Sequence, residues 1–119
     1  MTARDEVAAR IAALNDAFRK GERPELGRIV ITRGARAAVA AWPLGEIALY
    51  AKVKAFSEFT EDNDPHDEHD FGAFEHAGER FFWQIAYYEA DGTFNFGAEN
   101  PEDAETTTRV LTIMLAADY

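Results

Sequence analysis

The chain has 119 residues, a length typical of one domain, and we therefore expect a single hydrophobic core over residues 1–119. A hydrophobic fraction of 47% supports such a core and argues against a disordered chain. The sequence has no cysteine, which excludes disulfides and thiolate ligands, and its formal net charge of −10 argues against direct binding to nucleic acid.

We expect the protein to be cytoplasmic and to make no membrane contact. No run of about 18 apolar residues occurs, which is the length that crosses a bilayer. The first residues carry Asp5 and Glu6, where a secretory signal would be basic and then apolar.

The charges are divided unequally along the chain. Residues 1–57 hold ten basic and six acidic side chains, a net charge of +4. Residues 58–105 hold fifteen acidic side chains and one base, Arg80, a net charge of −14. This density of acids exceeds what solubility requires, and we expect it to serve binding.

The first half of the chain predicts a helix, a strand and two further helices. Four apolar residues recur at helical spacing and predict a helix over residues 5–20: Val7, Ile11, Leu14 and Phe18. A β-branched run between glycines predicts a strand over residues 28–32. The patterns that follow predict a short helix over residues 35–42 and a longer one over residues 44–59.

The second half opens with a predicted loop and an antiparallel hairpin. Residues 60–69 contain no hydrophobic side chain and include the turn sequence Asn63-Asp64-Pro65. Residues 70–75 and 80–88 predict two strands joined by a turn at Ala77-Gly78. The second of these strands has apolar side chains on both faces, which predicts a central position in the sheet.

A third antiparallel strand over residues 93–96 and a last helix complete the predicted order. Asn100 and Pro101 are typical of a helix cap and a first helical turn. The buried face of that helix would consist of Val110, Ile113, Met114 and Ala117. The order α-β-α-β-β-β-α predicts an α+β fold: a small antiparallel sheet of three to four strands covered by N-terminal, central and C-terminal helices.

Four short motifs run through the second half: Asn63-Asp64-Pro65, Glu68-His69-Asp70-Phe71-Gly72, Phe82-Trp83 followed by Ile85 and Tyr87-Tyr88, and Thr108-Arg109-Val110-Leu111-Thr112-Ile113-Met114-Leu115-Ala116. Together they resemble a family of small bacterial proteins catalogued only as a domain of unknown function. The resemblance covers most of the chain but departs at Gln84 and Ala86, where the family pattern has lysine and aspartate. It implies no catalytic residues.

The acidic segment is the candidate binding surface. Its carboxylates gather before the predicted hairpin and before the predicted last helix, in loops that are free to cluster at one end of the sheet. Such a field can imitate nucleic-acid phosphates toward a basic protein. The candidate partner-binding residues are Glu61, Asp62, Asp64, Asp67, Glu68, Asp70, Glu99, Glu102 and Asp103. We predict a binding protein and not an enzyme: an inhibitor or adaptor of a basic, nucleic-acid-handling partner, in the class that blocks restriction or CRISPR effectors.

The alternative is a metal or small-ligand site in residues 62–70. His66 and His69 are three residues apart among acids, and imidazole with carboxylate suits zinc, manganese or iron. The segment lacks the glycine and glutamate that an EF-hand requires. Acid–base catalysis by His69 with Asp70 or Glu68 is a further candidate, but His69 and Asp70 would not share a pocket because neighbours in a strand point to opposite faces. The sequence predicts no cofactor and no catalytic residue.

The aromatic block of the second hairpin strand has two interpretations. Its rings could form a stacking platform for a ligand, but a two-sided aromatic strand is also how a small sheet fills its core. We predict a core role for Phe81, Phe82, Trp83, Tyr87 and Tyr88. Self-association into a homo-oligomer is a third alternative for the function.

Overall fold

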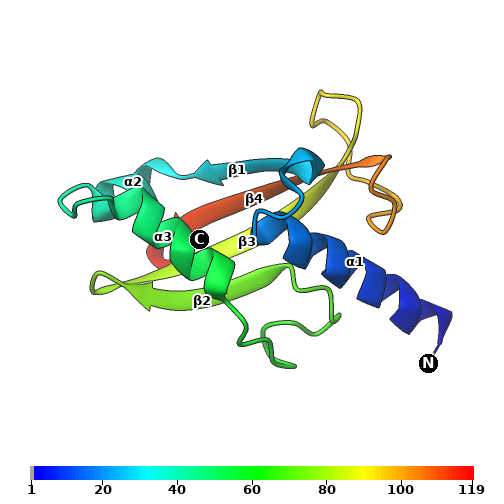
Figure 1. Cartoon of the computed structure of the whole chain (residues 1–119), viewed down its shortest axis with the longest axis horizontal. Helices are drawn as coiled ribbons and strands as arrows, with labels where there is room; N and C mark the ends of the chain where they lie inside the picture. Colours follow the sequence, from blue (N-terminus) through cyan, green and yellow to red (C-terminus); the bar gives the residue numbers. More distant parts are fainter. Residues whose placement is uncertain (1) are drawn as a thin grey trace.

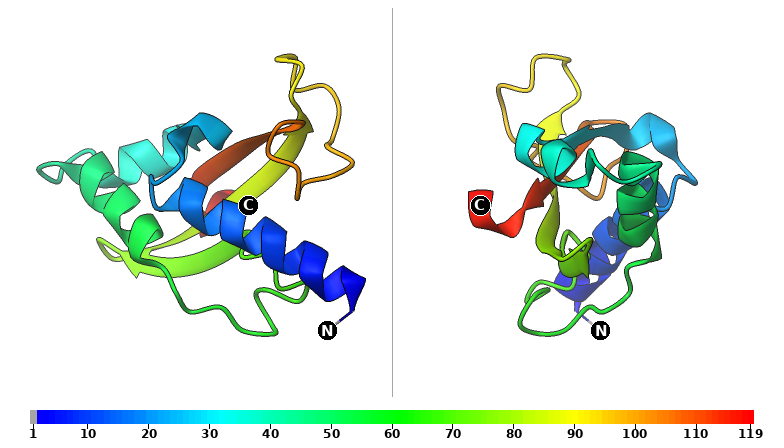
Figure 2. Two further views of the ribbon diagram at one scale, coloured as in Figure 1. Left: turned by 45° about the vertical axis from the view of Figure 1, so that its right-hand side comes forward. Right: turned by 90° about the vertical axis from the view of Figure 1, so that its left-hand side faces the viewer.

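The computed structural model describes residues 2–119 as a four-stranded sheet with helices against one face. In Figure 1, α1 and α3 cross in front of the sheet, and the right-hand view of Figure 2 shows the C-terminal segment on the opposite side. The predicted α+β class is confirmed. No helix in these residues is long and apolar enough to span a membrane. The elements are α1 (Ala3–Arg19), η1 (Pro24–Leu26), β1 (Gly27–Ile31), α2 (Arg33–Val39), α3 (Gly45–Ala55), β2 (Phe71–His76), β3 (Glu79–Glu89), β4 (Thr107–Leu115) and η2 (Ala116–Asp118).

Helix α1 begins at a capping box and buries two polar side chains. The Thr2 hydroxyl accepts the Asp5 backbone N–H at 3.2 Å, and the Asp5 carboxylate accepts the Thr2 backbone N–H at 3.1 Å. These bonds satisfy donors that a helix N-terminus leaves open. Asn15 and Arg19 lie on the buried face, where the spacing alone predicts apolar residues.

Arg19 joins α1 to the end of α3. Its guanidinium donates to the carbonyl oxygens of Val53 at 2.7 Å and Lys54 at 3.1 Å, in the last turn of α3, where carbonyl groups lack the usual partner four residues ahead. A cation at this position also matches the negative end of the helix dipole. Asp16 pairs with Arg19 at 3.1 Å, and the guanidinium lies 5.1 Å from the ring centre of Trp83. A side chain from the end of α1 therefore caps the C-terminal end of α3.

The sheet order is β1-β4-β3-β2. Strand β3 pairs antiparallel with both β2 and β4, which confirms its predicted central position. Strand β1 pairs parallel with β4, so the sheet is mixed and not wholly antiparallel. Strand β4 begins opposite the end of β3, where Thr107 pairs with Glu89, and β2 begins toward the same end, where Phe71 pairs with Gln84.

The predicted C-terminal helix is wrong, because residues 107–115 form β4. Arg109, Leu111 and Ile113 are each 0% exposed, the alternation of a strand with one face in the core. The segment is rich in threonine, valine and isoleucine, whose branched side chains favour a strand. Asn100 lies in the preceding loop, where its carbonyl oxygen accepts the Thr107 hydroxyl at 3.0 Å.

The predicted third strand over residues 93–96 is also wrong. This part of the chain makes a single bridge, between Tyr88 and Gly97, and β4 takes the place beside β3. Phe94 packs its ring 5.7 Å from that of Tyr88, and the Arg28 guanidinium lies 4.7 Å from the Phe94 ring centre. The segment is thus a loop that folds back over the sheet edge.

The predicted core role of the aromatic strand is confirmed for Phe81 and Trp83, whereas Phe82, Tyr87 and Tyr88 are only partly buried. Phe81 and Trp83 are each 0% exposed and face the helices. Trp83 packs edge-on against Phe56 at 5.5 Å. A Cβ atom at Gly72 would clash with the indole nitrogen of Trp83, so only glycine lets β2 pass this ring.

Candidate functional site

The two acidic segments are loops that leave the same end of the sheet. The first acidic loop, residues 56–70, joins α3 to β2, and the second acidic loop, residues 90–106, joins β3 to β4. Figures 1 and 2 show α1 passing between them, with the first acidic loop (green) below and the second (yellow to orange) above. The predicted placement of both groups of acids in loops is confirmed.

Asp64 organises the first acidic loop. Its side chain is 4% exposed, and Oδ1 accepts the backbone N–H groups of Glu68 at 2.9 Å and His69 at 3.1 Å. Ahead of it, the Thr60 N–H donates to Asn63 Oδ1 at 2.9 Å, and the Asn63 N–H donates to Thr60 Oγ1 at 3.3 Å. Asp64 therefore shapes the loop and does not display its charge.

His69 fastens the first acidic loop to α1. Its Nδ1 lies 3.0 Å from both carboxylate oxygens of Asp16, and its Nε2 lies 3.7 Å from Asp64 Oδ2. The ring stacks on Phe59 with centres 3.9 Å apart. A backbone φ of 55° places His69 in a region that non-glycine residues rarely occupy, and these contacts hold it there.

The two histidines of the metal alternative differ in their surroundings. His69 has both ring nitrogens facing carboxylates, whereas the side chain of His66 is exposed. Within residues 2–119, no group of three or more histidine, aspartate or glutamate side chains is arranged to hold a metal ion.

A buried polar network connects the two acidic loops. Asn15 Nδ2 donates to the carbonyl oxygen of Glu68 and to the hydroxyl oxygen of Tyr87, both at 2.9 Å. Asn15 Oδ1 accepts from Arg109 Nε at 2.6 Å, and Arg109 Nη2 donates to the carbonyl oxygen of Pro101 at 2.6 Å. The Tyr87 hydroxyl donates to Glu68 Oε1 at 2.9 Å. Asn15 thus ties the first acidic loop, through Arg109, to the second.

Arg109 brings a buried positive charge to this network. It is 0% exposed and forms no ion pair among residues 2–119. Burial lowers its pKa, and the neighbouring Tyr87 and Glu68 oppose that shift. Burial likewise raises the pKa of the Tyr87 hydroxyl, with the charges of Glu68 and Asp70 adding to the rise. An arginine side chain stays protonated in proteins, so its charge is held by oriented carbonyl dipoles and the Tyr87 ring, 5.4 Å away.

The nine candidate partner-binding residues do not share one environment. Asp64 is buried, and three side chains are partly buried: Glu68, Asp70 and Glu102. The other five are exposed: Glu61, Asp62, Asp67, Glu99 and Asp103. Burial raises the pKa of Asp70, and the charges of Glu68 and Asp64 raise it further. The five exposed carboxylates are therefore the ones that face an incoming partner.

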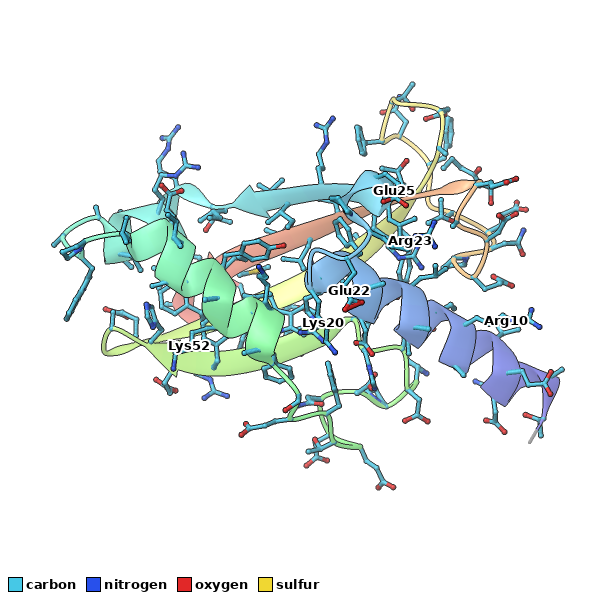
Figure 3. The ribbon with its side chains drawn as sticks, in the orientation of Figure 1. Arg10, Lys20, Glu22, Arg23, Glu25 and Lys52 are labelled. Atoms are coloured by element: carbon cyan, nitrogen blue, oxygen red, sulfur yellow. The ribbon has the colours of Figure 1, made fainter. Side chains whose placement is uncertain are left out.

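Few of these negative charges are neutralised within the protein. Of the acids in residues 58–105, only Glu75 pairs with an arginine or lysine in the described chain, with Arg80 at 3.0 Å. Some basic side chains of the first half lie near these loops, since α1 passes between them (Figure 1) and Arg4 lines a groove with residues 65–69. None of them forms an ion pair with an acid of residues 58–105 in the described chain. Figure 3 shows Arg10 on α1 and Lys52 on α3 at opposite sides of the view, and Arg23 beside Glu25, with which it pairs at 3.0 Å.

Asn15, Tyr87 and Arg109 were not predicted as site residues. One sequence signal does point to Asn15, since it follows Ile11 by four residues and precedes Phe18 by three, within the apolar stripe. Arg109 is the only basic residue after Arg80, which sets it apart in the sequence but does not indicate which residue it contacts. Their contacts span 72 and 94 residues of chain, which no local pattern can reveal.

The chain was compared with known families, curated proteins and solved structures. Neither the curated proteins nor the solved structures contain a match. A family described as "protein of unknown function (DUF3768)" matches residues 31–118, which include both acidic loops, Tyr87 and Arg109, whereas Asn15 and Asp16 of α1 precede the match. Since this match covers well over half of the sequence, the chain belongs to the DUF3768 family of proteins of unknown function.

Proposed function

We propose that this protein is an acidic binding module that engages a basic protein partner through the two acidic loops. The observation that carries the proposal is the set of exposed carboxylates at one end of the sheet that have no arginine or lysine partner within residues 2–119. A like-charged surface repels itself, and a basic partner relieves that repulsion as it docks.

Preorganisation supports the same proposal. Asp64, His69 and the Asn15–Arg109 link hold the loops in one shape, so little conformational entropy is lost when a partner binds. Loops that display charge on a rigid scaffold are a common form of binding site.

For the identity of the partner, we propose a bacterial nucleic-acid-handling effector in the cytoplasm, with the protein acting as an inhibitor or adaptor. A groove that binds DNA or RNA is lined by lysine and arginine to neutralise phosphates. The exposed carboxylates would occupy that groove in place of phosphates, as in inhibitors that block restriction or CRISPR effectors. The expected signature is fast, salt-sensitive association and competition with nucleic acid.

The test is affinity capture from bacterial lysate with a charge-neutralised variant and a matched control. The test variant carries five changes in the loops: Glu61→Gln, Asp62→Asn, Asp67→Asn, Glu99→Gln and Asp103→Asn. The control carries five changes at exposed acids elsewhere: Glu6→Gln, Glu22→Gln, Glu25→Gln, Glu46→Gln and Glu79→Gln. Both variants have the same net charge, so any difference between them reports the position of the charges.

We expect the unchanged protein and the control to capture a basic partner at low salt, and the test variant to lose it. Raising the salt from 50 to 300 mM should release the partner, and duplex DNA should compete for it. Capture that is equal for both variants, or that survives high salt, would contradict the proposal.

A further inference from the structure

A groove runs between α1 and the end of the first acidic loop. It has a volume of about 1170 Å³ and is lined by the first three turns of α1 on one side and residues 65–69 on the other. The groove is distinct from the exposed tip of that loop, because Asp64 and His69 hold residues 65–69 against the helix. Figure 1 shows this part of α1 extending beyond the sheet.

The helix side of the groove is apolar and consists mostly of small side chains. Ala8, Ala9, Ala12 and Ala13 line it together with Val7 and Ile11, and Ile11 is 4% exposed. Alanine leaves no long side chain above the helix backbone, so a second helix can approach closely along this face.

The walls of the groove are negatively charged. Its lining includes four carboxylates, one arginine (Arg4) and two histidines (His66 and His69); the carboxylates are Asp5, Asp16, Asp67 and Glu68. Asp16 is paired with Arg19 and faces His69, so Asp5, Asp67 and Glu68 supply the negative charge of the walls. Asp67 is exposed, and Asp5 stands near the other end of the groove. An apolar helix side between acidic walls is complementary to a segment that is apolar on one side and basic on its flanks.

We propose that this groove binds a basic amphipathic α-helix of the partner protein. The proposal rests on the function proposed above. It adds the segment of the partner that is recognised, a basic helix that the charges of the acidic loops would attract toward the groove. Apolar side chains of the bound helix would cover the alanines, and its flanking lysines or arginines would meet Asp67, Glu68 and Asp5.

The backbone of α1 and the length of the groove favour a bound helix over a bound extended peptide. An extended peptide gains affinity by adding to a free strand edge, whereas α1 already satisfies its backbone groups internally. The lining residues of α1 run from Arg4 to Asp16, which is roughly 18 Å of helix and matches about three turns of a bound helix.

The probe is a synthetic peptide of about 15 residues made of leucine, alanine and lysine, with a narrow apolar face flanked by lysines. A second peptide has the same composition in an order that breaks the apolar face. We expect the first peptide to bind the full chain and to gain helical circular dichroism on binding. The second should bind at least about tenfold more weakly, because it keeps the charge but cannot cover the alanines.

Two variants with equal charge locate the site. Ala9→Arg with Ala13→Arg blocks the groove, and Ala51→Arg with Ala55→Arg adds the same charge at exposed positions of α3. We expect the groove variant to lose at least about tenfold in peptide affinity and the α3 variant less than about threefold. The cooperative unfolding of each variant, followed by circular dichroism, confirms that both are folded.

The outcomes separate this inference from the proposed function. If the groove variant binds the helical peptide as well as the α3 variant does, or the two peptides bind equally, the groove is not a helix site. The proposed function fails by a different result, which is lysate capture that does not depend on the loop carboxylates. The groove inference therefore fails, and the proposed function stands, when lysate capture depends on the loop carboxylates but peptide binding does not depend on the groove.

Discussion

The two acidic loops carry similar charge and are built differently. In the first, Asp64 is buried and bonds two backbone N–H groups, and His69 joins the loop to Asp16 on α1. The second has no buried carboxylate and consists mostly of local turns, such as the one in which Asp103 accepts the N–H of Glu105 at 3.0 Å. It is anchored by the bond from Arg109 to the carbonyl oxygen of Pro101 and by the Phe94 ring, which lies under the Arg28 guanidinium.

The difference separates two uses of a carboxylate. A buried acid with several donors determines the shape of a loop, whereas an exposed acid without partners determines the field around it. A count of acids along the sequence treats both alike. We expect substitution of the buried Asp64 to change stability and substitution of the exposed acids of either loop to change mainly binding.

The largest expected loss of stability comes from Asn15→Ala, which removes the side chain that links the first acidic loop, through Arg109, to the second. The change leaves Arg109 Nε without its acceptor in a buried site and removes the N–H groups that the Tyr87 hydroxyl oxygen and the Glu68 carbonyl oxygen accept, although the Tyr87 hydroxyl still donates to Glu68 Oε1. Leaving such groups unsatisfied costs about 3 kcal/mol of unfolding free energy. Urea unfolding followed by tryptophan fluorescence measures this loss.

The matched control is Asn95→Ala, in which the residue is exposed in the second acidic loop. Its unfolding free energy should stay within about 0.5 kcal/mol of the unchanged protein. Equal stability of the Asn15 and Asn95 variants would show that the buried network does not hold the loops.

A smaller effect, of about 2 kcal/mol, is expected for Asp64→Ala, and less than about 0.5 kcal/mol for Asp103→Ala. Asp64 accepts two hydrogen bonds in a buried site, whereas Asp103 accepts one at the surface. Amide hydrogen exchange locates the change: protection at Glu68 and His69 should fall only in the Asp64 variant. A larger loss of unfolding free energy for Asp103→Ala than for Asp64→Ala would contradict the assignment of a structural role to Asp64 alone.

The smallest effect is the pH dependence that Asp70 gives to stability. Burial raises the pKa of this carboxyl above its ordinary value of 3.8, so the folded state holds the proton more tightly than the unfolded chain. Its contribution to stability is therefore present below that value and lost as the pH rises through the raised pKa. Asp70→Asn should be more stable than the unchanged protein at pH 7, by less than about 1 kcal/mol because the group is partly exposed and screened.

Thermal unfolding from pH 3 to pH 7 tests this, with Asp67→Asn as the control in the same loop. The stability gain of Asp70→Asn should disappear below pH 4, whereas the control should show a much smaller gain throughout. A gain of equal size in both variants would assign the effect to the overall charge of the loop.

Local patterns predicted the elements whose contacts are local. The stripe of α1, the helices that became α2 and α3, and the hairpin of β2 and β3 lie within a few residues of their predicted limits. The last segment failed because Val110, Ile113 and Met114 fit a helical spacing by coincidence. The alternation of Arg109, Leu111 and Ile113 carries the true period, and a buried arginine hides it.

The candidate site was predicted only in part. The sequence placed acids in two loops, but it could not distinguish Asp64, which is buried, from its exposed neighbours. His69 was singled out, yet its partner Asp16 is 53 residues away on α1. Pairs of this kind depend on how the helix lies over the sheet, which the sequence pattern does not encode locally.

The position of β4 has a consequence for how the chain folds. This strand follows the other three strands of the sheet in the chain and lies between β1 and β3, where Gly27 pairs with Arg109. Until residues 107–115 leave the ribosome, β1 has no neighbour and β3 keeps one edge open, which exposes strand edges in the growing chain. Contacts so distant in sequence also slow folding, since a long loop must close before β1 gains any stabilisation. The hairpin of β2 and β3 can therefore pair before β4 arrives, whereas β1 joins the sheet only afterwards.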